Sequence, residues 1–356
     1  MPARLPQRSG GFTFPLALVL FALTATSVAQ TPSVVPSQPP PDAPVAWKEL
    51  IGEYTGPQKK TLTIYEDAGK LRFAFSTPLS LEVSEITRDA VIFAKVAAQP
   101  PARILRGAQG SITGVTVGSD SFERRDLPAG ERSTLLVKPV RPISELRTEA
   151  LAASPPRESG AFRQPDLVEL ALLDPAIHLD IRYATSNDFL GTPVYTQARA
   201  FLQRPAAESL VRALRALEAR GYGLLIHDAY RPWFVTKIFW DATPPEGKIF
   251  VADPAQGSRH NRGCAVDLTL YDLRTGKPIE MPGTYDEMSP RSFPAYIGGS
   301  SLQRWHRDLL RQAMEAQGFT VYEYEWWHFD YKDWREYPIL NIPFEKLAAA
   351  AASSVN

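Results

Sequence analysis

The sequence predicts an α+β protein: a large C-terminal domain of mixed helices and strands, preceded by a small antiparallel β domain. Two observations support this fold class. Between Trp47 and Leu127, short stretches alternate apolar and polar residues and are separated by turn sequences, a pattern typical of antiparallel strands. From Asp166 onward, helical and strand-like patterns follow one another in uneven order, which favours α+β over a doubly wound sheet.

The N-terminus has the three parts of a secretory signal peptide. Arg4 and Arg8 precede an apolar run from Phe12 to Thr26, and the run ends in Ser27-Val28-Ala29. We therefore expect residues 1–29 to be a signal peptide and the protein to be exported, to the periplasm or the medium. The run is too short and interrupted for a membrane span, although an uncleaved anchor is the alternative.

The charge balance argues against a nucleic-acid partner. The 356 residues include 39 basic and 39 acidic side chains, and cleavage after Ala29 would remove two arginines to leave 37 against 39. No basic stripe of the kind that binds nucleic acid is visible. The single cysteine, Cys264, excludes an internal disulfide, which an exported protein of this size does not need.

The expected β domain carries no chemistry of its own. Strands are predicted at residues 61–65, 70–75 and 112–117, and the whole stretch contains no histidine and no acidic cluster at metal-ligand spacing. Residues 50–56 and 110–115 resemble the small lipocalin-like domain appended to some secreted serine hydrolases, which implies an accessory role. The remaining boundaries follow composition, with Pro-rich stretches as linkers: a linker at 30–45, the β domain at 46–127, a second linker at 128–165, the catalytic domain at 166–345 and a tail at 346–356.

Four elements of the large domain lead to its candidate site. Residues 205–220 predict a helix with Pro205 near its start and Gly221 after its end, followed by a buried strand at 224–226. A second helix is predicted at 301–317 and stops at Gly318. The strand predicted at 319–324 then leads directly to Glu325 and His328.

Two separate strings supply the residues of a catalytic zinc site. The string from Ser258 to Asp267 contains His260 and Asp267, and the string Glu325-Trp326-Trp327-His328 contains a second histidine. Two imidazoles and one carboxylate are the three protein ligands that a catalytic zinc needs, with a fourth position left for water. Glu325 is then the natural general base for that water.

This arrangement makes two demands on local structure. A turn at Gly263 entering a strand would let His260 and Asp267 converge on one metal ion. Glu325 and His328 would lie on opposite faces of a regular strand, so the chain must bulge or bend near Trp326 and Trp327.

Other candidate ligands have ordinary interpretations. His178, His227 and His306 are expected to be core or surface residues. Cys264 lies between two proposed ligands, so a thiolate ligand or nucleophile is one interpretation of it. Its small neighbours Gly263 and Ala265 favour the other, a buried apolar residue.

From about Ile181 to Asp330 the chain resembles the zinc D-alanyl-D-alanine dipeptidases, which are related to the zinc D,D-carboxypeptidases. The strings that carry the resemblance are residues 182–189, 221–225, 228–232, 258–270, 283–286 and 325–328. The resemblance implies one Zn²⁺ bound by His260, Asp267 and His328, with Glu325 as catalytic base and acid. It also implies that Arg231 holds the developing oxyanion, although pairing of Arg231 with Asp228 is a structural alternative.

The same resemblance implies the substrate contacts. Asp286 matches the acidic residue that pairs with the ammonium group of the substrate, and Tyr183 and Ser258 match positions that line the pocket. Cys264 stands where the family commonly has Ser, and Pro282 and Tyr285 alter the loop around Asp286. The implied activity is hydrolysis of the dipeptide D-Ala-D-Ala.

Two rival functions remain at this point. A D,D-carboxypeptidase or endopeptidase would trim cell-wall peptides, for which the ammonium side of the pocket must stay open. A non-catalytic wall-binding protein would hold structural zinc, but such sites usually have four protein ligands and need no base. Asp286 favours the dipeptidase over the first rival, and Glu325 favours an enzyme over the second.

Overall fold

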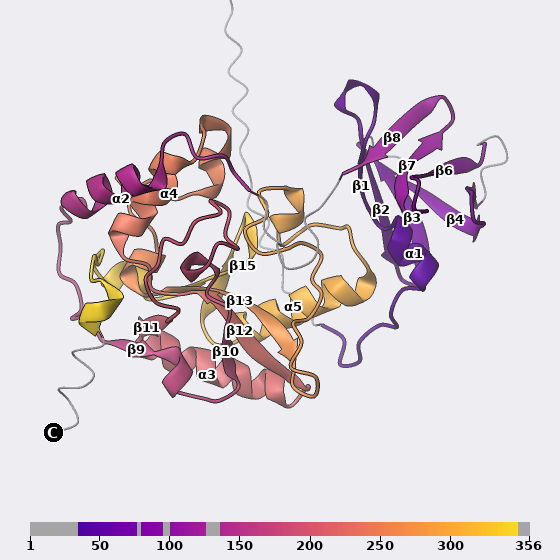
Figure 1. Cartoon of the computed structure of the whole chain (residues 1–356). Helices are drawn as coiled ribbons and strands as arrows, with labels where there is room; N and C mark the ends of the chain where they lie inside the picture. Colours follow the sequence, from indigo (N-terminus) through magenta and orange to yellow (C-terminus); the bar gives the residue numbers. More distant parts are fainter. Residues whose placement is uncertain (1–34, 77–79, 95–99, 126–135, 348–356) are drawn as a thin grey trace, which may run out of the picture. The chain divides into compact units, whose positions relative to one another are not determined.

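The computed structural model describes residues 35–76, 80–94, 100–125 and 136–347 (Figure 1). The predicted signal peptide at 1–29 lies outside the described residues, as do parts of both predicted linkers and residues 348–356 of the predicted tail. The described part combines helices and strands with an N-terminal antiparallel barrel, so the coarse fold class is confirmed.

The N-terminal β domain is a closed barrel of eight strands in sequential order, with every neighbouring pair antiparallel. The short helix α1 (Val45–Leu50) precedes it. Its strands are β1 (Gly52–Thr55), β2 (Thr61–Asp67), β3 (Lys70–Phe75), β4 (Ser80–Ile86), β5 (Ala90–Phe93), β6 (Ala102–Arg106), β7 (Ile112–Val117) and β8 (Asp120–Arg124). All three strands predicted from alternation are therefore confirmed.

Side chains fill the barrel because every second residue of each strand points inward. In β2, for example, Leu62 and Ile64 are buried, and large aromatic residues such as Phe73 and Phe122 close the interior. A Cβ atom at Gly114 would lie 2.5 Å from the carbonyl oxygen of Phe122, so the close approach of β7 and β8 requires glycine there.

The C-terminal domain is built on a five-stranded mixed sheet in the order β10-β12-β13-β15-β14. Only the pair β10 and β12 is parallel. The strands are β10 (Ile177–Leu179), β12 (Tyr222–Asp228), β13 (Ala265–Asp272), β14 (Phe319–Tyr322) and β15 (Glu325–Tyr331); β9 (Leu167–Glu169) and β11 (Phe201–Gln203) form a separate antiparallel pair. The central strands β12, β13 and β15 are buried almost throughout.

The two predicted helices are confirmed as α3 (Arg204–Glu218) and α5 (Ser301–Glu315), and they pack against each other beside the sheet (Figure 1). Helix α5 begins with a capping box in which Ser300 and Gln303 satisfy each other's backbone N–H groups. Helix α4 (Trp233–Ala242) follows β12 and packs against α2 (Ile143–Ala152).

The structure differs from the prediction at two places. Helix α2 lies inside the segment expected as the second linker, and its Ile143, Leu146 and Ala150 are buried in the core of the C-terminal domain. The strand expected at 319–324 ends at Tyr322, because a turn at Glu323 and Tyr324 starts a new strand at Glu325. Glu325 and His328 therefore belong to the return strand of a hairpin.

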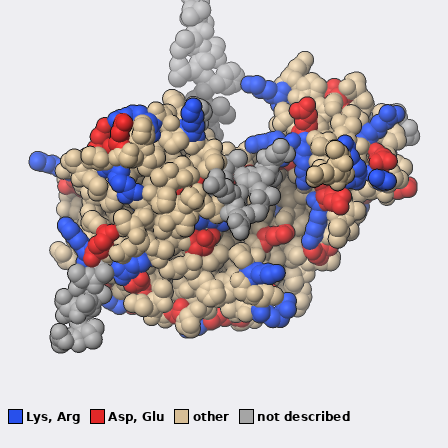
Figure 2. Space-filling model, in the orientation of Figure 1, with Lys and Arg blue, Asp and Glu red and all other residues tan. Residues whose placement is uncertain are grey.

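The surface agrees with a balanced charge. On the face drawn in Figure 2, basic and acidic side chains are interspersed. Among the described residues, no helix is both long enough and apolar enough to cross a membrane.

Candidate active site

The pairing of β13 with β12 and β15 places the candidate site residues of these strands side by side. Asp267 in β13 is the register partner of Asp228 in β12 and of His328 in β15. Side chains of directly paired residues lie next to each other on the same face of a sheet. Residues that are 100 positions apart in sequence, from Asp228 to His328, therefore meet in one row.

The predicted bulge near Trp326 and Trp327 is confirmed. Tyr322 pairs with Glu325, but the preceding residue Val321 pairs with Phe329, so three residues of β15 have no partner in this register. This irregularity lets Glu325 and His328 line the same cavity despite their spacing.

The predicted turn at Gly263 is also confirmed. His260 begins a single 3₁₀ turn that ends at Gly263, whose φ of 67° is the left-handed conformation that glycine adopts most readily. The N–H of Gly263 donates to the carbonyl of His260 at 3.0 Å, and β13 starts two residues later. The turn places the His260 ring against Asp267.

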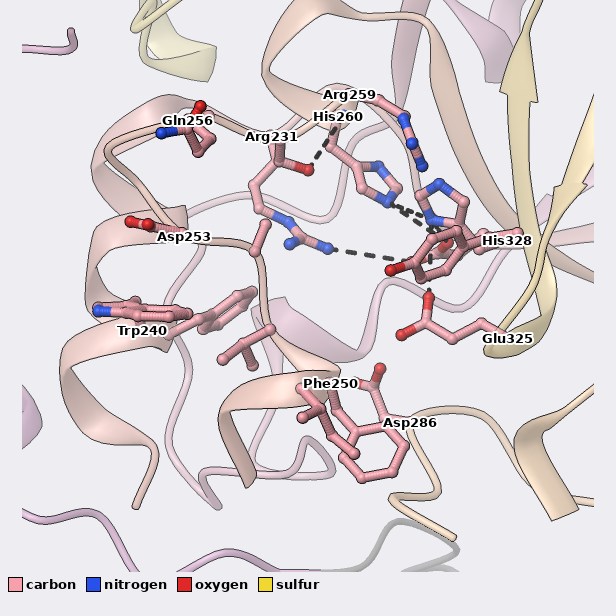
Figure 3. A pocket seen from close by; sticks show the side chains of 18 of the residues that line it. Arg231, Trp240, Phe250, Asp253, Gln256, Arg259, His260, Asp286, Glu325 and His328 are labelled. Carbon is pink, nitrogen blue, oxygen red and sulfur yellow. Dashed lines mark hydrogen bonds and ion pairs between the residues drawn. The ribbon is translucent and has the colours of Figure 1, made fainter. Parts of the chain in front are cut away.

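Three candidate ligand atoms converge at separations that suit a tetrahedral metal. Asp267 Oδ1 lies 3.4 Å from His260 Nε2 and 3.0 Å from His328 Nδ1. The two nitrogens are 3.0 Å apart, and the rings of His260 and His328 face each other in Figure 3. Ligands about 2.0–2.1 Å from a tetrahedral zinc ion are separated by roughly 3.3 Å. Asp267 Oδ1 is buried and accepts no hydrogen bond, as expected of an oxygen that faces a cation. These residues fit zinc in number, chemistry and spacing.

The surrounding groups fix the orientation of each ligand. His260 Nδ1 lies 2.7 Å from the carbonyl of Ala229, and His328 Nε2 lies 2.9 Å from Asp330 Oδ1. These contacts leave His260 Nε2 and His328 Nδ1 to face the metal position. Hydrogen-bond partners of the second ring nitrogen commonly orient metal-binding histidines in this way. The Tyr285 hydroxyl donates to Asp267 Oδ2 at 3.2 Å.

The electrostatics of the site favour a cation. Burial would raise the pKa of Asp267, but the imidazoles of His260 and His328 outweigh it and hold that pKa well below the usual value. Burial would lower the pKa of His328, yet Asp330 and Asp267 raise it to about 10. Since several carboxylates meet here away from water, positive charge is stabilised at this position.

Glu325 lies beside the three candidate ligands in the same cavity. Its Oε2 lies 3.7 Å from His328 Nδ1, and its side chain is 16% exposed. Burial is the main cause that raises the pKa of Glu325 to about 7. The charge of His328 lowers this pKa, and the charge of Asp267 raises it further. A carboxylate with a pKa near neutrality can both take and return a proton.

Arg231 is held rigidly next to the same cluster. Its Nε donates to Asp228 Oδ2 at 2.9 Å, and its Nη2 lies 2.8 Å from the same oxygen and 3.9 Å from Asp267 Oδ2. The guanidinium also lies over the rings of Tyr183 and Phe239. The pairing with Asp228 considered from the sequence is therefore present, and it fixes a cation that lines the cavity.

Asp286 lines the cavity with a left-handed backbone and a carboxyl oxygen that has no hydrogen-bond partner. Its backbone has a φ of 56°, and its Oδ2 is enclosed but accepts no hydrogen bond. Burial, followed by the charge of Asp267, raises the pKa of Asp286 well above its usual range. Tyr285, one of the residues that alter this loop, is buried and anchors it through Asp267 and by stacking on His227.

All of the residues predicted for the site line one cavity of about 590 Å³. They are Tyr183, Arg231, Ser258, His260, Asp267, Asp286, Glu325 and His328. Tyr183 is buried against Arg231, and Ser258 Oγ accepts from the N–H of His260 at 3.2 Å. The apolar wall is formed by residues of α4 and the segment after it, including Trp240 and Phe250 (Figure 3).

The remaining histidines and the cysteine have structural surroundings. His178 stacks on Tyr271, His227 stacks on Tyr285, and His306 hydrogen-bonds Tyr222. Cys264 is fully buried, which raises its pKa, so the apolar interpretation agrees with the structure. Among the described residues, the one cluster at metal-ligand spacing is His260, Asp267 and His328.

The sequence interpretation missed Asp330, the hydrogen-bond partner of His328. The sequence contained a signal for Asp330, because it follows His328 by two residues and residues two apart on a strand share a face. It also missed Arg259, which lines the cavity and pairs with Asp330.

Comparison with known proteins agrees with this geometry. A family described as D-Ala-D-Ala dipeptidase matches residues 163–346. The D-alanyl-D-alanine dipeptidase of Escherichia coli is 34% identical over 179 residues, which cover 50% of this chain and 91% of that protein. The enzyme of the same name from Enterococcus faecium is 36% identical over 187 residues, covering 47% and 93% of the two chains, and that of Streptomyces coelicolor is 34% identical over 175 residues, covering 44% and 87%. The chain therefore belongs to the D-Ala-D-Ala dipeptidase family and is an enzyme of the metallopeptidase class.

Proposed function

We propose that the protein hydrolyses D-Ala-D-Ala to two molecules of D-alanine with one Zn²⁺ held by His260, Asp267 and His328. The observation that carries the proposal is the convergence of these three ligand atoms beside Glu325 in the cavity. The similarity to D-alanyl-D-alanine dipeptidases along almost their full length supports the substrate. When bound, zinc would polarise the scissile carbonyl and lower the pKa of a water molecule.

Glu325 acts as general base and then as general acid. It takes the proton of the attacking water and passes it to the amine that leaves when the peptide bond breaks. Its pKa of about 7, raised mainly by burial, suits both steps at neutral pH. Replacing Glu325 by Ala should abolish turnover while zinc stays bound.

Arg231 stabilises the oxyanion. Charge appears on the carbonyl oxygen only in the transition state, so a cation fixed in advance accelerates the reaction without first having to reorganise. The two contacts with Asp228 supply this rigidity.

Asp286 binds the substrate ammonium group, with Tyr183 and Ser258 lining the pocket. The unpartnered Oδ2 is an acceptor whose partner would arrive with the substrate. An ammonium group would also reverse the effect of burial on Asp286, because a nearby cation favours the ionised carboxylate.

A D,D-carboxypeptidase is the second candidate, favoured by the size of the cavity. A volume of about 590 Å³ falls in the range that holds drug-sized ligands, which exceed a dipeptide of two alanines. Room beyond the dipeptide would let a longer cell-wall peptide enter.

One assay separates the two candidates. The purified, zinc-loaded protein is offered D-Ala-D-Ala and a pentapeptide ending in D-Ala-D-Ala, and D-alanine release is measured for each. Turnover of the dipeptide alone supports the dipeptidase and the role of Asp286. Preference for the pentapeptide assigns the protein to the carboxypeptidases, and activity of Glu325→Ala on either substrate contradicts the mechanism.

We further propose that the enzyme is exported after cleavage of residues 1–29 and that the barrel has an accessory role. Support for the latter is that every proposed site residue lies between Tyr183 and His328. N-terminal sequencing of the mature protein tests the cleavage site. A variant that keeps the signal but lacks residues 46–127 tests the barrel, since unchanged activity and localisation would leave it with no catalytic or targeting role.

A further inference from the structure

Arg259 lines the cavity but has no role in the proposed mechanism. Its side chain is 35% exposed, and its Nη1 lies 2.9 Å from Asp330 Oδ2. The guanidinium carbon is 5.3 Å from the ring centre of Tyr322 and 5.1 Å from that of Trp334. One ion pair and two aromatic faces thus hold a partly exposed cation at the cavity.

The hydrogen-bond donors of Arg259 are not all used. A guanidinium has five N–H donors, and among the described residues the Arg259 side chain makes one ion pair, between Nη1 and Asp330 Oδ2. The other two arginines of the cavity differ. Arg231 is bound by Asp228, and Arg262 donates to the Tyr337 carbonyl and to Glu158.

Arg259 and Asp286 lie on different sides of the candidate metal centre. In Figure 3, Arg259 runs alongside His260 and His328, whereas Asp286 lies beyond Glu325. A free dipeptide carries an ammonium group at one end of its scissile bond and a carboxylate at the other. The cavity therefore offers an acid on one side and a cation with spare donors on the other.

We propose that Arg259 binds the free C-terminal carboxylate of the substrate. The inference rests on the proposed peptidase function and names the group that the site recognises. A planar guanidinium matches a carboxylate with two parallel hydrogen bonds, and such charge-assisted bonds are among the strongest in proteins. Stacking on Tyr322 and Trp334 fixes the guanidinium before the substrate arrives, which reduces the entropy lost on binding.

This assignment makes the enzyme act at the C-terminal end of its substrate. D-Ala-D-Ala and a pentapeptide ending in D-Ala-D-Ala both present a free carboxylate, so Arg259 serves either of the two candidate activities. An endopeptidase substrate has no carboxylate next to the scissile residue, so the assignment argues against that third activity.

The alternative is a positioning role. Arg259 pairs with one oxygen of Asp330, whose other oxygen contacts His328, so its loss could simply loosen that ligand. The two roles differ in what they predict. Loss of a carboxylate contact harms only substrates that carry the carboxylate, whereas a loosened ligand harms every substrate and lowers zinc content.

The test compares D-Ala-D-Ala with D-alanyl-D-alaninamide, in which the carboxylate is replaced by a neutral amide. kcat/KM for both peptides and the zinc content are measured for the wild-type protein, Arg259→Met, Arg259→Lys and the control Arg262→Met. Arg262 lines the same cavity but has its own protein partners, so its substitution should leave the ratio between the two peptides unchanged.

We expect Arg259→Met to lower kcat/KM for D-Ala-D-Ala by roughly 10- to 150-fold, as for loss of a hydrogen bond to a charged group. The amide should change little, zinc should stay bound, and Arg259→Lys should recover part of the loss. If the ratio of kcat/KM between the two peptides stays the same, whether both values fall equally or neither falls, the proposal is overturned.

Binding to the inactive Glu325→Ala background separates this proposal from the proposed function. Calorimetry with both peptides on Glu325→Ala and on Glu325→Ala/Arg259→Met needs no turnover. Arg259-dependent binding of D-Ala-D-Ala by a protein whose wild type does not hydrolyse it would overturn the dipeptidase function alone. Equal binding of acid and amide to Glu325→Ala would overturn the role of Arg259.

Discussion

Replacing Asp286 by Asn should make the protein more stable and a worse enzyme. Asp286 has an enclosed Oδ2 without a hydrogen-bond partner, and its pKa is raised well above the usual range, mainly by burial. Enclosing such an acceptor costs about 1–3 kcal/mol, and a neutral amide of the same shape removes the charged part of that cost. The φ of 56° adds no penalty, because Asn tolerates this conformation better than most residues.

The gain should depend on pH in a defined direction. Because the pKa of Asp286 is raised on folding, the folded state binds its proton more tightly than the unfolded state. The penalty is absent below the unfolded pKa of about 3.9 and grows as the pH rises toward the folded pKa. Asp286→Asn should therefore raise the melting temperature by about 2–12 °C at pH 8, and by less at pH 5.

Activity should move the other way. Loss of the charged partner of the substrate ammonium should raise KM for D-Ala-D-Ala by roughly 10- to 150-fold. Differential scanning calorimetry and steady-state kinetics are run on Asp286→Asn and on Asp253→Asn, the second of which changes another acid of the same cavity and should alter neither stability nor KM. A destabilised Asp286→Asn, or one with an unchanged KM, would refute the reasoning.

Three further predictions concern Arg231, Asp330 and His306. Replacing Arg231 by Met should lower kcat by roughly 10²–10³-fold with zinc retained, and an unaltered kcat would exclude it as the oxyanion partner. Replacing Asp330 by Asn should weaken zinc binding by roughly 10–100-fold in a chelator competition, because the amide keeps an acceptor for His328 but lacks the negative charge that raises the basicity of the imidazole; unchanged affinity would contradict this. Burial lowers the pKa of His306 to about 4, so the folded state favours the neutral imidazole. The free energy of unfolding should therefore be constant with respect to His306 above about pH 6.5 and fall by at most about 3 kcal/mol toward pH 4. Urea unfolding should show this loss in the wild type and not in His306→Gln, which still offers a polar group to Tyr222; parallel pH profiles for both proteins would contradict it.

Much of the site could be predicted because its residues occur in short strings with strong local signals. Gly263 marks the turn that brings His260 to Asp267, and the spacing of Glu325 and His328 on a strand requires a bulge. Strand β7 could be read from alternation alone, since one face of a barrel strand is buried.

The remainder depends on contacts between distant segments, which a single sequence does not show. Helix α2 has a stripe of Ile143, Leu146 and Ala150, but the stripe is short and is stabilised by packing rather than by local pattern. The exposed position of Arg259 depends on the rings of Tyr322 and Trp334, which reach it from other parts of the chain. Such three-dimensional neighbours decide which arginine of a cavity keeps N–H donors for a ligand.

The row formed by Asp228, Asp267 and His328 makes metal affinity a reporter of correct sheet assembly. A slip of β15 by one residue against β13 would turn His328 to the opposite face and dismantle the ligand set, although most backbone hydrogen bonds could still form. An ion bound by these side chains thus selects the native strand register over its nearest competitors, and its binding energy is added to the stability of that register alone. Molecules with a slipped β15 would lack this ligand set, so the metal content of a preparation should fall as their share rises.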